Sequence, residues 1–171
     1  AIDYQPLPAC SDAEAALEPG APQVWSEVAG NLGLDYEDGD RAAVDAALAA
    51  AHKVVRVRLE NQRITGCPLE PRGAIGDYDA ASGRYTLHLS GQDVMGIRAC
   101  LAEQVLRIEP DRLRVITPDV GGGFGTKGYL YPEYGLVCWA AKKVGRPVKW
   151  VAGRDEAFIS DAHARALVSH V

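Results

Sequence analysis

The apolar residues of this sequence switch repeatedly between two spacings, and this switching constrains the fold more than any other feature. Alternating or short apolar runs are typical of strands, whereas apolar residues three or four apart are typical of amphipathic helices. Strands are predicted over residues 54–63, 72–78, 84–89, 113–117, 147–152 and 166–171. Helices are predicted over residues 40–51, 94–108 and 132–144, with short helical turns at residues 12–17 and after residues 153–156. We therefore expect an α+β fold with a mixed sheet and packed helices.

The first 39 residues lack this regular pattern. Pro6, Pro8, Pro19 and Pro22 and several glycines fall within residues 5–39 and predict an extended connector. Residues 1–4 have the pattern of the end of a strand, and residues 166–171 that of a strand with no visible partner. Unpartnered strands at both ends suggest a piece of a longer protein, and their open edges favour self-association.

Composition and charge exclude several classes of protein. The 171 residues carry 18 Lys and Arg against 23 Asp and Glu, a net charge of −5, which argues against a nucleic-acid partner. No run of about 18 apolar residues and no signal peptide is present, so no membrane association is expected. The four cysteines lie far apart, without a CxxC pair, and are expected to be reduced and mostly buried: Cys10, Cys67, Cys100 and Cys138. No protein-ligated metal is predicted, since the four histidines are equally dispersed.

A glycine-rich segment over residues 120–128 follows one predicted strand and precedes a helix. Consecutive glycines expose main-chain N–H donors, so the segment fits an anion or cofactor cradle. The equally open alternative is a flexible loop that places Phe124 in the core. A P-loop is excluded because Thr126 precedes Lys127 and Gly128 follows it. A dinucleotide fingerprint matches only formally, from Gly123 to Gly128, because Pro132 starts the helix too late.

Several motifs in order carry a resemblance to a known family. They are Thr-Pro-Asp-Val-Gly-Gly-Gly-Phe-Gly-Thr-Lys at 117–127, Pro-Glu at 132–133, Gly-Arg-Pro-Val-Lys-Trp-Val at 145–151, Arg-Asp-Glu at 154–156 and His-Ala-Arg at 163–165. This sequence resembles the large, molybdenum-binding subunit of the molybdenum hydroxylases, the family of xanthine dehydrogenase, aldehyde oxidase and aerobic carbon monoxide dehydrogenase.

The resemblance implies a domain organisation and an activity. Residues 1–8 would end the hammerhead domain, residues 9–39 form the connector, and residues 40–171 form the first part of a molybdopterin-binding domain. The complete enzyme would oxidise an aldehyde, an N-heterocycle or carbon monoxide with oxygen derived from water. The family's catalytic glutamate lies beyond the matched segment, so this chain alone is expected to be inactive. Purine-oxidising members carry a glutamate where this sequence has Gly128, which argues against a purine substrate.

The resemblance also implies the residues that bind the cofactor. Gln92 would reach the molybdenum-bound ligands, and Phe124 would lie against the cofactor together with Gly122, Gly123 and Gly125. No residue of this chain would be catalytic or ligate the metal. Without the resemblance, the residues alone favour Gln92 as a polar residue at a helix start, because Asp93 and an amphipathic run follow it.

Further cofactors and partners follow only from the family. Molybdopterin, with the cytosine dinucleotide among its forms, would bind here, and [2Fe–2S] clusters and FAD would lie on other domains or subunits. The expected partners are the rest of the large subunit, those subunits, a small-molecule substrate and further copies in an oligomer, all in the cytoplasm. Glu70 with Arg72 is expected to form an ion pair, and Arg154 with Glu156 is expected to support the sheet edge or to contact another subunit. The alternative function is a non-catalytic interaction module with a glycine-rich hinge.

Overall fold

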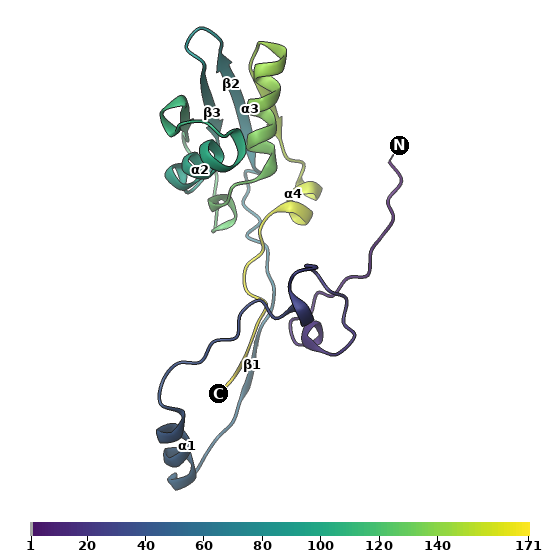
Figure 1. Ribbon diagram of the computed structural model, residues 1–171, viewed down its shortest axis with the longest axis vertical. Helices are drawn as coiled ribbons and strands as arrows, with labels where there is room; N and C mark the ends of the chain where they lie inside the picture. Colours follow the sequence, from purple (N-terminus) through teal and green to yellow (C-terminus); the bar gives the residue numbers. More distant parts are fainter. Residues whose placement is uncertain (1) are drawn as a thin grey trace. The chain divides into compact units, whose positions relative to one another are not determined.

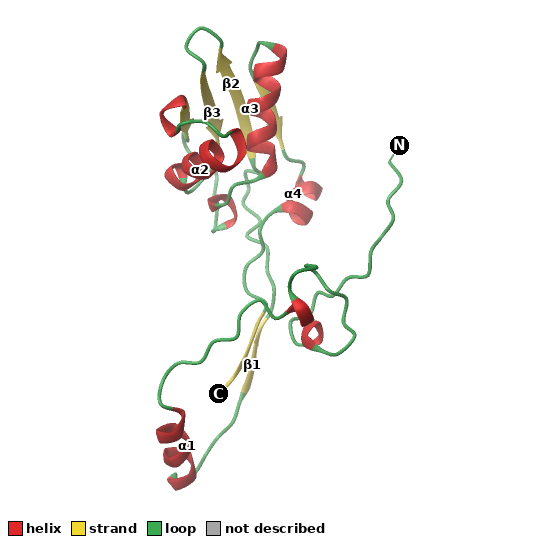
Figure 2. Ribbon diagram, viewed as in Figure 1, coloured by secondary structure: helices red, strands yellow, loops and turns green. Residues whose placement is uncertain are grey.

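The computed structural model describes residues 2–171 and divides into two compact units. The first comprises residues up to Arg63 together with Arg165–Val171, and the second comprises Ile64–Ala164. Both units combine helices and strands (Figures 1 and 2). The α+β prediction is confirmed.

The first unit contains one pair of short strands. β1 (Arg58–Asn61) pairs antiparallel with β6 (Leu167–His170), with Arg58 opposite His170. The last strand therefore has a partner, and the expectation that it lacks one is wrong. The predicted strand over residues 54–63 is shorter than expected, because its first residues make no ladder beyond the pairing of Val57 with Val171.

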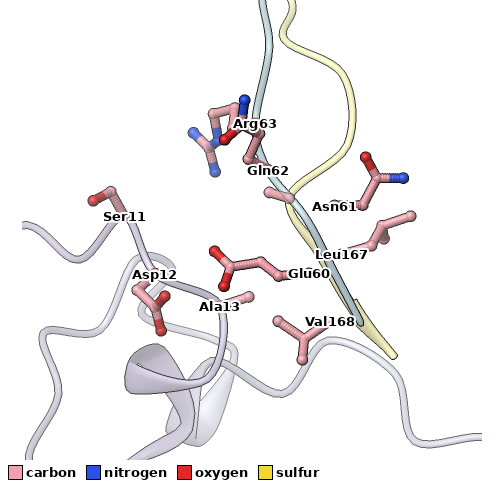
Figure 3. A pocket seen from close by; sticks show the side chains of 10 residues that line it. Ser11, Asp12, Ala13, Glu60, Asn61, Gln62, Arg63, Leu167 and Val168 are labelled. Atoms are coloured by element: carbon pink, nitrogen blue, oxygen red, sulfur yellow. The ribbon is translucent and has the colours of Figure 1, made fainter. Parts of the chain in front are cut away.

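The remaining elements of the first unit are helical. The 3-10 turns Ala15–Leu17 and Ala29–Asn31 lie in the connector, and α1 spans Arg41–Ala50. The Asp40 side chain caps α1 by accepting a hydrogen bond from the Ala43 amide at 2.9 Å. The apolar face of α1 is exposed rather than packed. Residues 2–4 form no strand, and residue 1 lies outside the described residues. Figure 3 shows a pocket between residues 11–13 and the β1–β6 pair, lined by both polar and apolar side chains.

The second unit is built on a four-stranded sheet. Its strands are β2 (Gly73–Asp79), β3 (Arg84–Leu89), β4 (Leu113–Ile116) and β5 (Val148–Val151), in the order β4-β3-β2-β5. β2 is antiparallel to both β3 and β5, whereas β3 and β4 run parallel. The predicted hairpin and the mixed sheet are thus confirmed.

Helices connect these strands. α2 (Val94–Cys100) continues as a π-helical turn at Leu101–Leu106, so the single helix predicted over residues 94–108 changes its winding midway. A 3-10 turn at Pro110–Arg112 leads into β4, and another lies at Thr126–Gly128. α3 spans Pro132–Val144 and α4 spans Arg154–Ser160. Pro132 suits the start of α3, and Gly145, at φ 67°, ends it.

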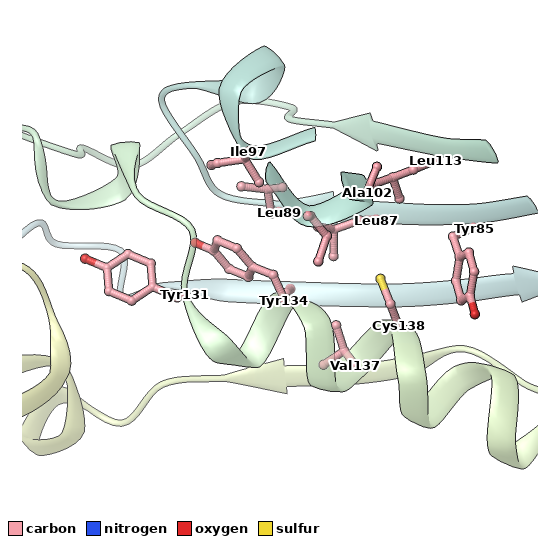
Figure 4. Packing of buried hydrophobic residues seen from close by; sticks show 12 residues of the cluster. Tyr85, Leu87, Leu89, Ile97, Ala102, Leu113, Tyr131, Tyr134, Val137 and Cys138 are labelled. Carbon is pink, nitrogen blue, oxygen red and sulfur yellow. The ribbon is translucent and has the colours of Figure 1, made fainter. Parts of the chain in front are cut away.

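One face of the sheet carries the core. α3 packs along β2, and Figure 4 shows Tyr134, Val137 and Cys138 of α3 facing Leu87 and its neighbours. Strand and helix approach closely at Gly76, where a Cβ atom would lie 2.5 Å from the carbonyl carbon of Val137. Only glycine fits there without displacing backbone.

All four cysteines are free, but only Cys138 is buried, so the expectation that most are buried is wrong.

No helix within residues 2–171 is both long and apolar enough to cross a lipid bilayer.

Candidate functional site

The glycine-rich loop lies between β4 and α3 and bends sharply. Gly122 and Gly125 have φ angles of 96° and 89°, which favour glycine, and Phe124 between them has φ 51°. A bulky residue rarely takes this left-handed conformation, and such strain is concentrated at functional sites. The Phe124 side chain is 71% exposed, so the alternative that it fills the core is wrong.

Gln92 lies between β3 and α2 and contacts this loop directly. Its Oε1 accepts hydrogen bonds from the amides of Gly125 at 2.9 Å and Lys127 at 3.3 Å. Its own main-chain amide donates to the Lys127 carbonyl at 3.1 Å. Because two N–H donors occupy Oε1, the orientation of the carboxamide is fixed. Its Nε2 donates to no acceptor among residues 2–171, and this donor therefore stays available on an exposed side chain.

Gly123 is required by proximity to Gln92 rather than by its φ angle. A Cβ atom on Gly123 would lie 2.4 Å from both Cδ and Oε1 of Gln92. A second segment, around Gly66, also lies close to the loop, since a Cβ atom on Gly66 would lie 2.7 Å from Cγ2 of Thr126. The loop thus packs between the segments that contain Gly66 and Gln92.

The loop presents main-chain donors without protein acceptors. Within residues 2–171, no hydrogen bond uses the amides of Gly122, Gly123 or Phe124. The turn is held instead from the Thr126 side, where both the amide and Oγ1 of Thr126 donate to the Gly123 carbonyl, at 2.9 and 2.8 Å. Three adjacent free amides in a bent loop form a suitable site for anionic oxygens.

Near the end of the loop, the buried ammonium group of Lys127 is bound to the carboxylate of Glu70. Lys127 is fully buried, and its Nζ donates to Oε2 of Glu70 at 2.8 Å and to Oγ of Ser90 at 2.7 Å. The Ser90 hydroxyl and the Gly121 amide also donate to Oε2 of Glu70, at 2.6 and 2.7 Å. Burial tends to raise the pKa of Glu70, but these hydrogen bonds outweigh burial and lower the pKa from 4.5 to about 2.

The expected ion pair between Glu70 and Arg72 does not form. Each side chain has other partners: Glu70 pairs with Lys127, whereas Arg72 pairs with Asp161 at 2.6 Å and Glu133 at 3.0 Å. Its guanidinium also lies 3.6 Å from the centre of the Tyr131 ring. Arg154 donates to the Leu69 carbonyl at 2.7 Å, and Glu156 accepts from the Gly153 amide at 3.2 Å.

The structure brings the five predicted site residues together and adds three more. Gln92, Gly123 and Gly125 are in direct contact, and Gly122 lies against the Phe124 ring. Sequence reasoning missed Lys127, Ser90 and the role of Glu70 in holding the loop. The one available signal is a lysine inside a glycine-rich loop that fits no phosphate-binding motif. No group of three or more His, Cys, Asp or Glu side chains suited to a metal ion lies within residues 2–171.

Comparison with known proteins identifies the family. Residues 24–171 match the sequence model of the molybdopterin cofactor-binding domain. The chain belongs to this family. The match supports the cofactor-binding prediction over the alternative of a non-catalytic interaction module.

Individual relatives agree with this assignment. The chain is 32% identical to the carbon monoxide dehydrogenase large chain of Hydrogenophaga pseudoflava, over 96% of this chain and 22% of that protein. It is 35% identical to the nicotine 6-hydroxylase large subunit of Paenarthrobacter nicotinovorans, over 88% of this chain and 19% of the relative. The solved structure of reconstituted CO dehydrogenase from Oligotropha carboxidovorans superposes with a TM-score of 0.84 at 31% identity, over 95% of this chain and 22% of that one. The chain thus spans about a fifth of the length of these relatives.

The residues of the loop fit molybdopterin. Free amides suit the anionic oxygens of its phosphate, an exposed aromatic ring suits the flat pterin system, and glycines let both approach the main chain. The free Nε2 of Gln92 adds a fixed donor beside them.

Proposed function

We propose that this chain forms part of the molybdenum-cofactor-binding subunit of a molybdenum hydroxylase, which oxidises an aldehyde, an N-heterocycle or carbon monoxide with oxygen from water. The observation that carries the proposal is the fixed carboxamide of Gln92, whose Oε1 is held by the amides of Gly125 and Lys127. It presents Nε2 next to three free main-chain donors. When bound, the molybdenum cofactor supplies the redox chemistry.

The residues of this chain bind and orient. Gly122, Gly123 and Phe124 offer main-chain amides to anionic oxygens, the Phe124 ring offers a flat apolar surface, and Gly125 holds Gln92 in place. Gln92 donates a hydrogen bond from Nε2 toward the cofactor. No residue here is assigned as catalytic or as a metal ligand.

The domain organisation belongs to the same proposal. Residues 1–8 end a hammerhead domain, residues 9–39 form a connector, and residues 40–171 form the first part of the molybdopterin-binding domain. The irregular backbone of the connector, with its two 3-10 turns, supports this division. The rest of a large subunit then supplies the catalytic residues.

Further cofactors and partners complete the proposed enzyme. The cofactor is molybdopterin, with the cytosine dinucleotide among its forms, and [2Fe–2S] clusters and FAD on other domains or subunits would take up the electrons. The enzyme is an oligomer in the cytoplasm and acts on a small molecule. The names of relatives as a large chain and a large subunit support a multi-subunit assembly.

Two substitutions in the full-length enzyme, purified with its native partner subunits, test the proposal. Gly123→Val inserts a branched side chain against Gln92 and is expected to lower molybdenum and pterin content. Gln92→Ala is expected to retain the cofactor while turnover per molybdenum falls by about tenfold or more, because a fixed donor is lost. Full molybdenum in Gly123→Val together with full turnover per molybdenum in Gln92→Ala would refute the proposed site.

A further inference from the structure

Lys127 is the feature of the loop that cofactor binding leaves unexplained. In phosphate-binding loops a lysine reaches the ligand, but here the side chain is fully buried. Its Nζ already donates to Glu70 and Ser90, at 2.8 and 2.7 Å, and both acceptors come from outside the loop. Burying an ammonium group costs free energy unless the group is paired. The Lys127 ammonium is therefore held at the position where Glu70 and Ser90 accept its hydrogen bonds.

The main chain of the same residue holds Gln92. The Lys127 carbonyl accepts from the Gln92 amide at 3.1 Å, and the Lys127 amide donates to Oε1 of Gln92 at 3.3 Å. The position of the Gln92 carboxamide therefore depends on where Lys127 is anchored.

Glu70 holds the other end of the loop as well. Its Oε2 accepts from the Gly121 amide at 2.7 Å, and its own amide donates to the Gly121 carbonyl at 3.3 Å. One carboxylate thus binds both residue 121 and residue 127, and Ser90 bridges it to Lys127. Between these two anchors lie the glycines and Phe124, and the anchors fix the span of the loop.

We propose that Glu70, Ser90 and Lys127 form a positioning clamp that sets the orientation of Gln92, and that Lys127 makes no contact with the cofactor. The inference rests on the proposed function of Gln92. The three residues are positioning residues, since they act through the loop and through Gln92. Removing the clamp is expected to loosen the loop and misplace the carboxamide while the glycines that accommodate the cofactor remain.

The test compares variants of the full-length subunit in its assembled enzyme. Lys127→Met keeps the length of the side chain but removes its donors, and Lys149→Met, on the exposed face of β5, is the matched control. Hydrogen–deuterium exchange is measured in peptides covering residues 120–128 and 132–144. This measurement does not depend on the catalytic activity of the enzyme. Loop exchange in Lys127→Met is expected to accelerate about tenfold or more, while exchange in α3 stays unchanged. Turnover per molybdenum is expected to fall by a similar factor.

A second pair of variants separates positioning from general support. If Lys127 acts through Gln92, Lys127→Met should lower turnover per molybdenum by less than about twofold in a Gln92→Ala background. Fully additive losses would contradict the clamp. Should Lys127→Met fail to fold, Ser90→Ala decides, because it removes the hydroxyl that accepts from Lys127 and donates to Glu70 while the direct Lys127–Glu70 ion pair remains. A smaller acceleration of loop exchange is then expected, and wild-type loop exchange and turnover in Ser90→Ala would refute the three-residue clamp.

The outcomes separate this inference from the proposed function. Wild-type loop exchange in Lys127→Met, with reduced turnover in Gln92→Ala, would overturn the clamp alone. Unchanged turnover per molybdenum in Gln92→Ala would overturn the proposed role of Gln92 and with it the clamp's positioning role.

Discussion

Gly123 and Gln92 lie so close that a single methyl group on Gly123 would overlap the Gln92 carboxamide, at 2.4 Å from its Cδ. The neighbour that must move is the end of a flexible side chain rather than backbone. A small substitution at Gly123 should therefore act on the orientation of Gln92 before it acts on folding.

Gly123→Ala is predicted to lower turnover per molybdenum by about tenfold in the full-length enzyme, since it displaces the donor Nε2. In a Gln92→Ala background the same substitution should have little further effect, because no carboxamide is left to displace. Gly128→Ala is the matched control, since a Cβ there meets nothing within 4 Å. Equal losses from Gly123→Ala in both backgrounds would contradict this explanation.

Phe124→Ala is predicted to change cofactor retention more than stability. The ring is 71% exposed, so its removal should shift the free energy of unfolding of the 171-residue chain by no more than about 0.5 kcal/mol. Molybdenum and pterin content of the full-length enzyme should fall, because a stacking surface is lost. Urea denaturation and elemental analysis measure the two quantities. A large loss of stability with full molybdenum would show that the ring is structural.

Arg72→Met is predicted to destabilise the 171-residue chain by about 3–5 kcal/mol, because it leaves a buried carboxylate uncompensated. Arg72 is fully buried and pairs with Asp161, whose side chain is 2% exposed. Arg84→Met, on the exposed end of β3, should change stability by less than about 0.5 kcal/mol. Urea denaturation followed by tryptophan fluorescence compares them. A similar midpoint for both variants would contradict the role given to Arg72.

Acid is predicted to weaken the second unit through Glu70. Its pKa is lowered in the folded chain from 4.5 to about 2, so the folded state favours the carboxylate. This contribution to stability is complete above about pH 4.5 and is lost as the pH falls toward about 2. Glu70→Gln should therefore flatten the pH dependence of unfolding between these values, measured by urea denaturation at a series of pH values. An unchanged slope in Glu70→Gln would show that other carboxylates determine it.

Much of the fold of the second unit could be predicted from local patterns. Apolar spacing locates β2, β3, β4, β5 and α3 to within one or two residues. Each element has one buried face, on which apolar residues recur at every second position in a strand and every third or fourth in a helix. The same reasoning fails for the first unit. There α1 and the residues before β1 have the apolar pattern of packed elements but are exposed. An apolar pattern shows which face of an element is apolar, but it does not show which other segment packs against that face.

The sequence by itself determined the family, the strand–helix order and the five candidate residues around the glycine loop. Only the tertiary structure decided how they are held, because the partners are distant in the chain. The contact of Gln92 with Gly125 spans 33 residues and that of Glu70 with Lys127 spans 57. Sequence proximity also suggested an ion pair of Glu70 with Arg72, whereas in the structure Glu70 pairs with Lys127 and Arg72 with Glu133 and Asp161. Local patterns record which residues face inward, and only packing decides which of them meet.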